Sequence, residues 1–283
     1  MSLEDDFCDI IKKSRLGQER SVSDVAKEAG LPLQDLEALE KGSRQPISEE
    51  VESLGVTLHL KAPSLYEVSL EGWVPQVPTI GTTQEGPVIT VLGDIGGYEV
   101  KGYLLFDPQT RDAVMIDTAY NAPQMISIVK ERGLRLKAIC LTHGHADHAG
   151  GLDTILKEWP VPVYLGDGDF PLLPWKPSKE QLSLPAHNQC LPVGSLGVQF
   201  VATPGHTPGG FCYQVQGAEQ DVCFVGDTIF AGSIGRSNPF ASYQTHLQSV
   251  REQVLELPES TVLFPGHGPA TTVKEERISN PFG

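Results

Sequence analysis

Apolar positions in the first 60 residues recur at helical spacing. Such spacing places them on one side of a helix, and serine, proline and glycine mark the expected helix ends. The pattern predicts three short helices: the first carries Phe7, Ile10, Ile11 and Leu16; the second begins at a Ser21 or Ser23 cap and ends at Gly30; the third runs from Pro32 through Leu33, Leu36 and Leu39 to Gly42. We therefore expect a small all-helical domain over residues 1–60.

Residues 61–86 are rich in proline and glycine, which is typical of a linker and could supply an edge strand. From residue 87 onward, short apolar runs alternate with turn residues, as in strands. Strands are expected at Val88–Leu92, Tyr103–Phe106, Ala113–Ile116, Ala138–Leu141, Val161–Tyr164, Val198–Ala202, Phe211–Val215, Val222–Val225 and Thr261–Phe264. Helices are expected at Pro123–Arg132, Leu152–Glu158 and Ser242–Leu257. The pattern predicts a second domain, residues 87–283, with two mostly antiparallel sheets covered by helices on the outside.

Composition narrows the class of protein. The 283-residue sequence has a formal charge of −15 at pH 7, which disfavours a nucleic-acid or anionic-membrane surface over the whole molecule. Its five cysteines contain no Cys-x-x-Cys motif, which favours reduced thiols over a disulfide framework. No stretch reaches the roughly 18 apolar residues of a membrane span, and the first residues lack the basic and apolar regions of a signal peptide. We therefore expect a soluble, cytoplasmic protein with no membrane partner.

Residues 21–42 resemble the helix-turn-helix of Cro and phage repressors, in which the second helix of the pair enters the major groove of DNA. The corresponding helix here carries Gln34, Asp35, Glu37 and Glu40, and residues 1–60 contain 7 lysines and arginines against 13 aspartates and glutamates. Carboxylates repel the phosphate backbone, so DNA binding is disfavoured and no residue is assigned to it. Homodimerisation, packing on the larger domain and binding of a protein partner are the other roles open to this module.

A cluster of metal-ligand side chains follows the predicted strand at Ala138–Leu141. Its members are His143, His145, Asp147 and His148. A Gly-Gly pair, residues 150 and 151, follows the cluster, as expected for a turn. Imidazole and carboxylate groups together suit zinc, iron or manganese, and a bound ion offsets the cost of desolvating them beside an apolar strand. The sequence therefore predicts a metal site where this strand ends.

Three later residues repeat this arrangement. His206, Asp227 and His267 each follow an apolar run and are flanked by glycine. Glycine lets a loop turn sharply, as it must to bring a side chain to a shared centre. The remaining histidines lack this arrangement and are expected on the surface or in loops: His59, His187 and, on an exposed helix, His246.

Four ordered motifs together resemble the metallo-β-lactamase superfamily. They are Thr-His-x-His-x-Asp-His at residues 142–148, Pro-Gly-His-Thr-Pro-Gly at 204–209, Gly-Asp-Thr at 226–228 and Pro-Gly-His-Gly-Pro at 265–269. The run from Gly226 to Arg236 and the triplet Asn280-Pro281-Phe282 are similar to the glyoxalase II-like branch. The resemblance spans residues 87–283 and implies an α+β fold, an αβ/βα sandwich with the active site at one edge between two sheets.

The resemblance also implies a hydroxyacylglutathione hydrolase-like thioesterase with two metal ions. One zinc ion would be held by His143, His145 and His206, the second by Asp147, His148 and His267, with Asp227 bridging them. Two such cations can share a hydroxide that attacks a thioester, Asp147 acting as the catalytic residue that orients it. The departing thiolate needs no obligatory protonation. The expected cofactor is two Zn²⁺, with Fe²⁺ or a mixed zinc, iron and manganese centre as the alternative; the expected partner is a small-molecule thioester, with a glutathione thioester as one candidate.

Several polar residues near these motifs are expected to support them. Arg236 has two candidate roles: it could anchor an anionic group of the substrate or, as we prefer, brace Asp227 from behind. Thr142, Thr207 and Thr228 are expected to hold loops or ligands through their hydroxyl groups.

Other functions stay open at this point. A persulfide dioxygenase of the same superfamily would use one iron held by residues matching His143, His206 and Asp227, a set of two histidines and one carboxylate. A lactonase is a further option within the superfamily. A regulator would sense a thiol metabolite and bind DNA with little catalysis. Glyoxalase II enzymes carry a helical C-terminal extension that supplies much of the glutathione site, whereas this sequence ends 16 residues after His267, so glutathione specificity is open.

Overall fold

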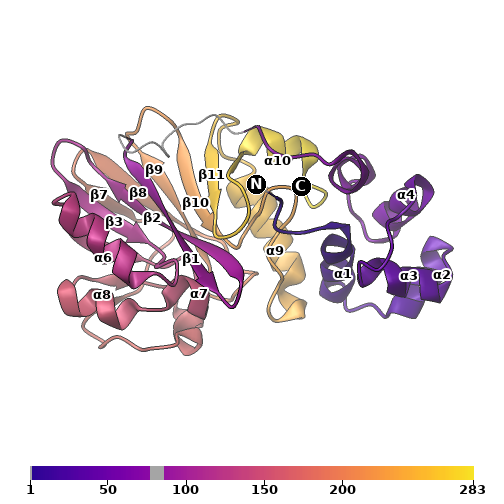
Figure 1. The fold of residues 1–283 in the computed structure, drawn as a ribbon, viewed down its shortest axis with the longest axis horizontal. Coiled ribbons are helices and arrows are strands. Elements are labelled where there is room, and N and C mark those ends of the chain that lie inside the picture. Colours follow the sequence, from indigo (N-terminus) through magenta and orange to yellow (C-terminus); the bar gives the residue numbers. More distant parts are fainter. Residues whose placement is uncertain (1, 77–85) are drawn as a thin grey trace.

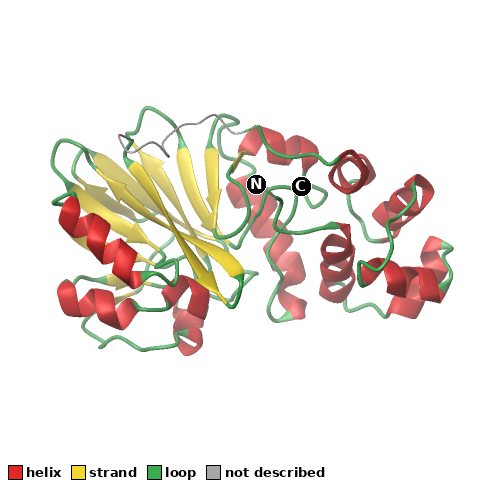
Figure 2. Ribbon diagram, in the orientation of Figure 1, coloured by secondary structure: helices red, strands yellow, loops and turns green. Residues whose placement is uncertain are grey.

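Two six-stranded sheets pack face to face, and helices cover both outer faces (Figures 1 and 2). The computed structural model describes residues 2–76 and 86–283. A group of N-terminal helices lies at one end of the molecule, beyond the helices on the outer face of the second sheet, and the two chain termini lie near each other between these parts (Figure 1). The layer order is that of the expected αβ/βα sandwich.

The first sheet has the strand order β1-β2-β3-β4-β5-β6. Its strands are β1 (Val88–Ile95), β2 (Tyr98–Phe106), β3 (Asp112–Ile116), β4 (Arg135–Cys140), β5 (Val163–Tyr164) and β6 (Leu182–Ser183). The pairs β1–β2 and β2–β3 are antiparallel, but the pairs from β3 to β6 are parallel. The prediction of mostly antiparallel sheets is therefore wrong for this sheet. The reason is that α6 (Ala122–Glu131) and α8 (Leu152–Glu158) serve as the crossovers that parallel neighbours require.

The second sheet has the order β12-β11-β10-β9-β8-β7 and is mostly antiparallel, as predicted. Its strands are β7 (Cys190–Val193), β8 (Leu196–Ala202), β9 (Phe211–Gln216), β10 (Val222–Gly226), β11 (Val262–Pro265) and β12 (Thr271–Thr272). Strands β10 and β11 run parallel. Their crossover contains α9 (Tyr243–Ser249) and the π-helical turn η4 (Val250–Val254), which together occupy the predicted helix at 242–257.

Three apolar clusters fill the spaces between the layers. The one between the sheets contains aromatic side chains such as Tyr103, Phe200 and Phe224. A second lies between the first sheet and α6 and α8. Because both faces of each sheet are covered, central strands are buried on both sides, and all residues of β10 are buried. The remaining helices of the sandwich are short: α7 (Ala146–Ala149), η2 (Asp167–Leu172), η3 (Phe240–Ser242) and α10 (Val273–Ser279).

The N-terminal helices lie where the sequence predicts them and continue further. They are α1 (Phe7–Gly17), α2 (Val22–Ala29), α3 (Leu33–Glu40), α4 (Ser48–Thr57), α5 (Ala62–Tyr66) and the π-helical turn η1 (Glu67–Glu71). Ser21 caps α2 by accepting a hydrogen bond from the Asp24 amide, and Gly30 ends it in the left-handed conformation with φ of 69°. Helices α2 and α3 lie in the segment that resembles a helix-turn-helix, and both this assignment and its binding role stay predictions.

Part of the expected linker is helical. Residues 62–71 form α5 and η1, because Pro63 lies in the first turn of α5, where a proline starts a helix rather than breaking one. Tyr66 and Trp73 pack against the same apolar cluster as the N-terminal helices. Residues 77–85 lie outside the described residues, and so does any edge strand that they would supply.

One carboxylate of α3 points away from the face that would meet DNA. Glu40 forms a buried two-bond ion pair with Arg15 of α1, at 2.5 Å for Nε to Oε1 and 2.8 Å for Nη2 to Oε2. Breaking such a pair would leave an uncompensated buried charge. The expectation that Glu40 faces a phosphate backbone is therefore wrong, whereas Glu37 is exposed as expected.

The third apolar cluster joins the N-terminal helices to the second sheet. It contains Ile10, Ile11 and Leu36 of the N-terminal helices together with Tyr243 and Val250 of the β10–β11 crossover. Polar contacts cross the same boundary: Ser64 Oγ donates to the Ile278 carbonyl at 2.8 Å, and the Lys61 amide donates to the Pro281 carbonyl at 2.8 Å. The N-terminal helices thus share a core with the sandwich. Among the described residues, no helix combines the length and apolarity needed to cross a membrane.

We expect this shared core to make unfolding cooperative across both parts. Ile11→Ala removes a fully buried side chain, and the resulting cavity should lower the free energy of unfolding by about 2–5 kcal/mol. In urea titrations, far-UV circular dichroism and tryptophan fluorescence, which includes Trp159 and Trp175 of the sandwich, should shift to lower midpoints together. Leu33→Ala, at a side chain that is 45% exposed, is the control with a small effect. An earlier, separate transition in circular dichroism, with an unchanged midpoint in tryptophan fluorescence, would contradict the shared core.

Candidate metal centre

The structure brings all seven predicted ligand residues to one edge of the sandwich. They lie just beyond the ends of four strands: His143, His145, Asp147 and His148 after β4, His206 after β8, Asp227 after β10, and His267 after β11. Asp147 and His148 lie in α7, the short helix that follows the His143–His145 turn. The ends of strands from both sheets therefore converge on a single site.

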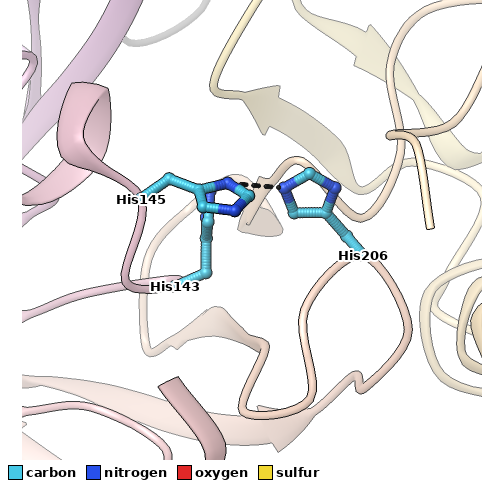
Figure 3. A group of neighbouring side chains, drawn as sticks. All are labelled: His143, His145 and His206. Carbon is cyan, nitrogen blue, oxygen red and sulfur yellow. Dashed lines mark hydrogen bonds between the residues drawn. The ribbon is translucent and has the colours of Figure 1, made fainter. Parts of the chain in front are cut away.

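Three imidazoles form the first group. The rings of His143, His145 and His206 point toward a common centre, two from the turn after β4 and one from the β8–β9 loop (Figure 3). Their ligand nitrogens lie within 4.8 Å of one another. His145 Nδ1 and His206 Nε2 are 3.2 Å apart. Nitrogen ligands at this spacing suit zinc or iron.

The second group contains carboxylates. His148, Asp227 and His267 place ligand atoms within 4.8 Å of one another, and so do His143, Asp147 and His148. Asp147 Oδ2 lies 3.3 Å from His267 Nε2. Asp227 faces both groups: its Oδ2 is 3.5 Å from His206 Nε2, and its Oδ1 is 3.3 Å from His148 Nε2. This position between the groups is the one that a bridging ligand would occupy.

Unpaired buried atoms support metal binding at this place. Among the described residues, His143 Nε2, His148 Nε2 and Asp227 Oδ1 are buried without a hydrogen-bond partner. Leaving one such group unsatisfied costs about 1–3 kcal/mol, so three at one point require a common explanation. A bound cation would satisfy all three. The donor set, imidazole nitrogens with carboxylate oxygens, fits divalent zinc, iron or manganese.

Asp117, which the sequence analysis missed, supports the centre from behind. It accepts hydrogen bonds from the Thr142 amide and hydroxyl, both at 2.7 Å, and its Oδ2 lies 2.8 Å from His148 Nδ1. Thr142 Oγ1 is in turn 3.1 Å from His143 Nδ1. Asp117 follows the apolar end of β3, just as Asp227 follows an apolar run. Unlike Asp227, it has no flanking glycine, which is why the sequence pattern did not mark it.

Asp169 is a second supporting carboxylate that the sequence analysis missed. This fully buried side chain accepts hydrogen bonds from the Gly144 amide at 3.0 Å, the Thr207 hydroxyl at 2.7 Å and the Gly209 amide at 2.7 Å. It therefore joins the turn that carries His143 and His145 to the loop that carries His206. The expectation that Thr207 holds a loop agrees with this contact. Nothing in the sequence pattern around Asp169 marks it, since this residue does not follow an apolar run.

Main-chain carbonyls orient two of the other three imidazoles. His206 Nδ1 lies 2.8 Å from the Arg236 carbonyl, and His267 Nδ1 lies 2.6 Å from the Glu99 carbonyl. Such partners fix the ring orientation and leave Nε2 free for a metal. Within the described residues, the Arg236 guanidinium forms no hydrogen bond or ion pair with Asp227, and its exposed side chain lines the adjacent cavity, so its predicted bracing role gains no support from these contacts. Thr228 bonds Thr203, at 3.2 Å, rather than a ligand.

Two glycines are required by close approach. A Cβ at Gly266 would collide with the His148 ring and with Asp227, and a Cβ at Gly226 would collide with the Thr142 side chain. Gly226 also has a positive φ of 48°, which other residues adopt rarely. The glycines that flank Asp227 and His267 in the sequence therefore let neighbouring loops come together around the centre.

The local charges divide the imidazoles into two kinds. Burial lowers the pKa of His206 to about 4 and lowers the pKa of His143 well below its usual value. Burial also opposes the charged form of His267, but Asp227 and Asp147 outweigh it and raise the pKa to about 9. His206 and His143 are therefore neutral and ready to bind a metal at pH 7, whereas His267 must release a proton first.

The other histidines differ in part from expectation. His59 is exposed, as predicted. His246 is fully buried and not on an exposed helix face: its Nε2 lies 2.8 Å from the Thr228 carbonyl and its Nδ1 lies 3.1 Å from Ser237 Oγ. Burial lowers the pKa of His246 to about 3. Its partners come from another part of the chain, so the local pattern could not reveal them.

Comparison with known proteins agrees with this geometry. The Metallo-beta-lactamase superfamily profile matches residues 100–267. The chain is 33% identical over 202 residues to the probable metallo-hydrolase YqgX of Bacillus subtilis, covering 66% of this chain and 94% of the relative. It is 32% identical over 196 residues to the hydroxyacylglutathione hydrolase GloC of Haemophilus influenzae, covering 63% and 90%. The crystal structure of TTHA1623 in a di-iron-bound form is similar, with a TM-score of 0.57, 28% identity, and coverage of 69% of this chain and all of that one.

The chain belongs to the metallo-beta-lactamase superfamily. The fold predicted from the four motifs is confirmed, and relatives of the glyoxalase II type are present at about 30% identity. The matches cover the sandwich and leave the N-terminal helices outside the superfamily profile.

We expect Asp117 to control metal affinity without being a ligand. Asp117→Asn removes the charge that holds His148 and Thr142 and should weaken zinc binding about 10- to 100-fold, the range seen for partners behind metal ligands. Competition with a chromophoric chelator at fixed pH measures this change. Asp153→Asn, at a carboxylate of α8 that pairs with Lys157, is the matched control. Equal affinity in both variants would show that Asp117 has no such role.

Proposed function

We propose that this protein is a metal-dependent hydrolase that cleaves thioesters of small molecules. The observation that carries the proposal is the pair of ligand groups that share one edge, with Asp227 facing both and three buried ligand atoms lacking other partners. His143, His145 and His206 would hold one metal ion, and Asp147, His148 and His267 would hold the second, with Asp227 between them. Two bound divalent cations supply a nucleophile derived from water and a Lewis acid for a carbonyl.

Asp147 is the proposed catalytic residue among these. Although burial opposes its ionisation, the hydrogen bond with His267 lowers the pKa of Asp147, so it is a carboxylate at neutral pH. Its side chain is 23% exposed, more than that of Asp227 or His148. An ionised carboxylate that is still reached by solvent can accept a hydrogen bond from a water molecule and orient it.

A thioester suits this centre better than an ester or an amide. A thiolate with a parent pKa of about 8.5 departs without a proton donor, whereas an alkoxide or an amine needs one. The similarity to the hydroxyacylglutathione hydrolase GloC supports the same substrate class. A cavity of about 600 Å³ opens beside His145, His206 and His267 and has room for a substrate of this size.

The test is release of free thiol from S-lactoylglutathione by the zinc-loaded protein. Asp147→Asn should lower kcat by about 10²- to 10⁴-fold, the usual contribution of a positioned base, and His206→Ala should abolish zinc-dependent turnover by removing a ligand. Incubation with a chelator should stop the reaction, and added zinc should restore it. His59→Asn is the control, because His59 is exposed and its positive φ of 56° suits asparagine. Normal turnover in the Asp147 and His206 variants would refute the assignment.

A persulfide dioxygenase is the second candidate. Its single iron would use His143, His206 and Asp227, a set of two histidines and one carboxylate. The ring centres of His143 and His206 are 4.7 Å apart, and His206 Nε2 lies 3.5 Å from Asp227 Oδ2, which supports this set. The similar TTHA1623 has a crystal structure in a di-iron-bound form, which supports iron as a metal for this candidate.

Metal content and oxygen consumption separate the two candidates. Under the hydrolase proposal, the purified protein should carry two metal ions per chain and consume no oxygen with glutathione persulfide. Elemental analysis and an oxygen electrode measure both quantities. One iron per chain together with oxygen uptake would replace the hydrolase with the dioxygenase.

A further inference from the structure

The N-terminal helices form one wall of the cavity beside the metal centre. On one side the cavity is lined by His145, His206, Asp227 and His267. On the other side it is lined by the segment before α1 and by α1 itself, through residues that include Asp5, Lys12, Lys13 and Leu16. The N-terminal helices therefore line the space where a substrate would lie.

This wall is held in place by specific contacts. Lys13 Nζ donates to the Ile234 carbonyl at 2.5 Å and pairs with Asp5 at 2.5 Å, and it lies 5.7 Å from the centre of the Phe230 ring. Ser14 Oγ is 3.1 Å from the Tyr243 hydroxyl on the sandwich side. Because the N-terminal helices also share an apolar core with the second sheet, α1 is a fixed part of the cavity rather than a loosely tethered neighbour.

Two of the acidic groups of this wall have partners. Asp5 is paired with Lys13. Asp9 accepts a hydrogen bond from the Asp6 amide at the start of α1, at 3.2 Å. Glu4 is an exposed residue that also lines the cavity. The ion pair with Lys13 therefore offsets the charge of one of these carboxylates.

Two cations of the cavity wall have no such partner. Lys12 of α1 and Arg236 of the sandwich are both exposed, and both line the cavity. In the described parts of the chain, neither side chain forms an ion pair or a hydrogen bond. If carboxylates of the protein paired with Lys12 and Arg236, the two cations would only stabilise the fold. Without such partners, they are available to an anionic ligand in the cavity.

We propose that Lys12 and Arg236 bind a carboxylate on the thiol part of the substrate, so that α1 selects thioesters of acidic thiols. This inference rests on the proposed thioesterase function and deepens it. The reacting carbonyl must lie against the metal ligands, which leaves the thiol part to extend toward the wall formed by α1. Leu16 and Tyr98, which also line the cavity, offer apolar surface to the chain between the two ends.

Matched substrates and variants test the proposal. S-lactoylglutathione and S-lactoyl-N-acetylcysteamine share an acyl group, but only the first carries carboxylates on its thiol part. Lys12→Glu and Arg236→Glu should each raise the KM for S-lactoylglutathione roughly threefold to tenfold, the effect expected for one charge-assisted contact, and raise the KM for the neutral thioester less. Lys41→Glu makes the same charge change on an exposed residue at the end of α3, away from the cavity, and should change neither KM.

A binding measurement separates this proposal from the proposed reaction. Isothermal titration of the zinc-loaded protein with S-methylglutathione, a thioether that cannot be hydrolysed, should give a Kd that rises in the Lys12 and Arg236 variants and not in Lys41→Glu. If S-methylglutathione binds with this dependence on Lys12 and Arg236 but no thioester is cleaved, the proposed reaction is wrong and the proposed binding site is supported. If both thioesters are cleaved and Lys12→Glu affects them equally, the reaction stands and the proposed site is wrong. Absence of S-methylglutathione binding to the unaltered protein would also overturn it.

Discussion

Seven candidate metal-ligand side chains meet at one edge of this protein, and the burial of most of them is the constraint on which the surrounding structure depends. His148 is fully buried and Asp227 is only 7% exposed. Desolvated imidazoles and carboxylates are costly unless they are paired or bind a cation. Asp117 and the main-chain carbonyls of Arg236 and Glu99 satisfy the far side of the rings, which leaves the near side to a metal. The centre is therefore an organised site before any ion enters.

The topology explains why these residues meet. Parallel pairing of β3 with β4 and of β10 with β11 places the ends of these strands at the same edge, and the face-to-face packing of the two sheets brings that edge of each sheet together. Asp117, the histidine cluster, Asp227 and His267 are the residues that follow these four strands. The crossover helices that permit parallel pairing thus also determine where the ligands converge.

Short-range sequence patterns predicted the elements that depend only on neighbouring residues in the chain. The strand cores and the ligand residues follow from apolar runs that end in histidine, aspartate and glycine, and α8 has the predicted bounds. Features that depend on distant partners were not accessible in this way. Asp169 gains its role only because two loops meet at it, and His246 is buried because the Thr228 carbonyl and Ser237 reach it from elsewhere in the chain. Very short strands such as β6 and β12 offer too few residues for an alternating pattern.

The N-terminal helices are connected to the centre by a continuous series of contacts. The ring of Tyr243 occupies the space that a side chain at residue 17 would need, so Gly17 allows α1 to lie close to the sandwich. At that distance Lys13 reaches the Ile234 carbonyl, two residues before Arg236, whose own carbonyl orients His206. A displacement of α1 would therefore disturb the segment that holds a metal ligand as well as the cavity wall. Because packing of this kind is close and stiff, the position of α1 and the geometry of the metal centre are parts of one structure.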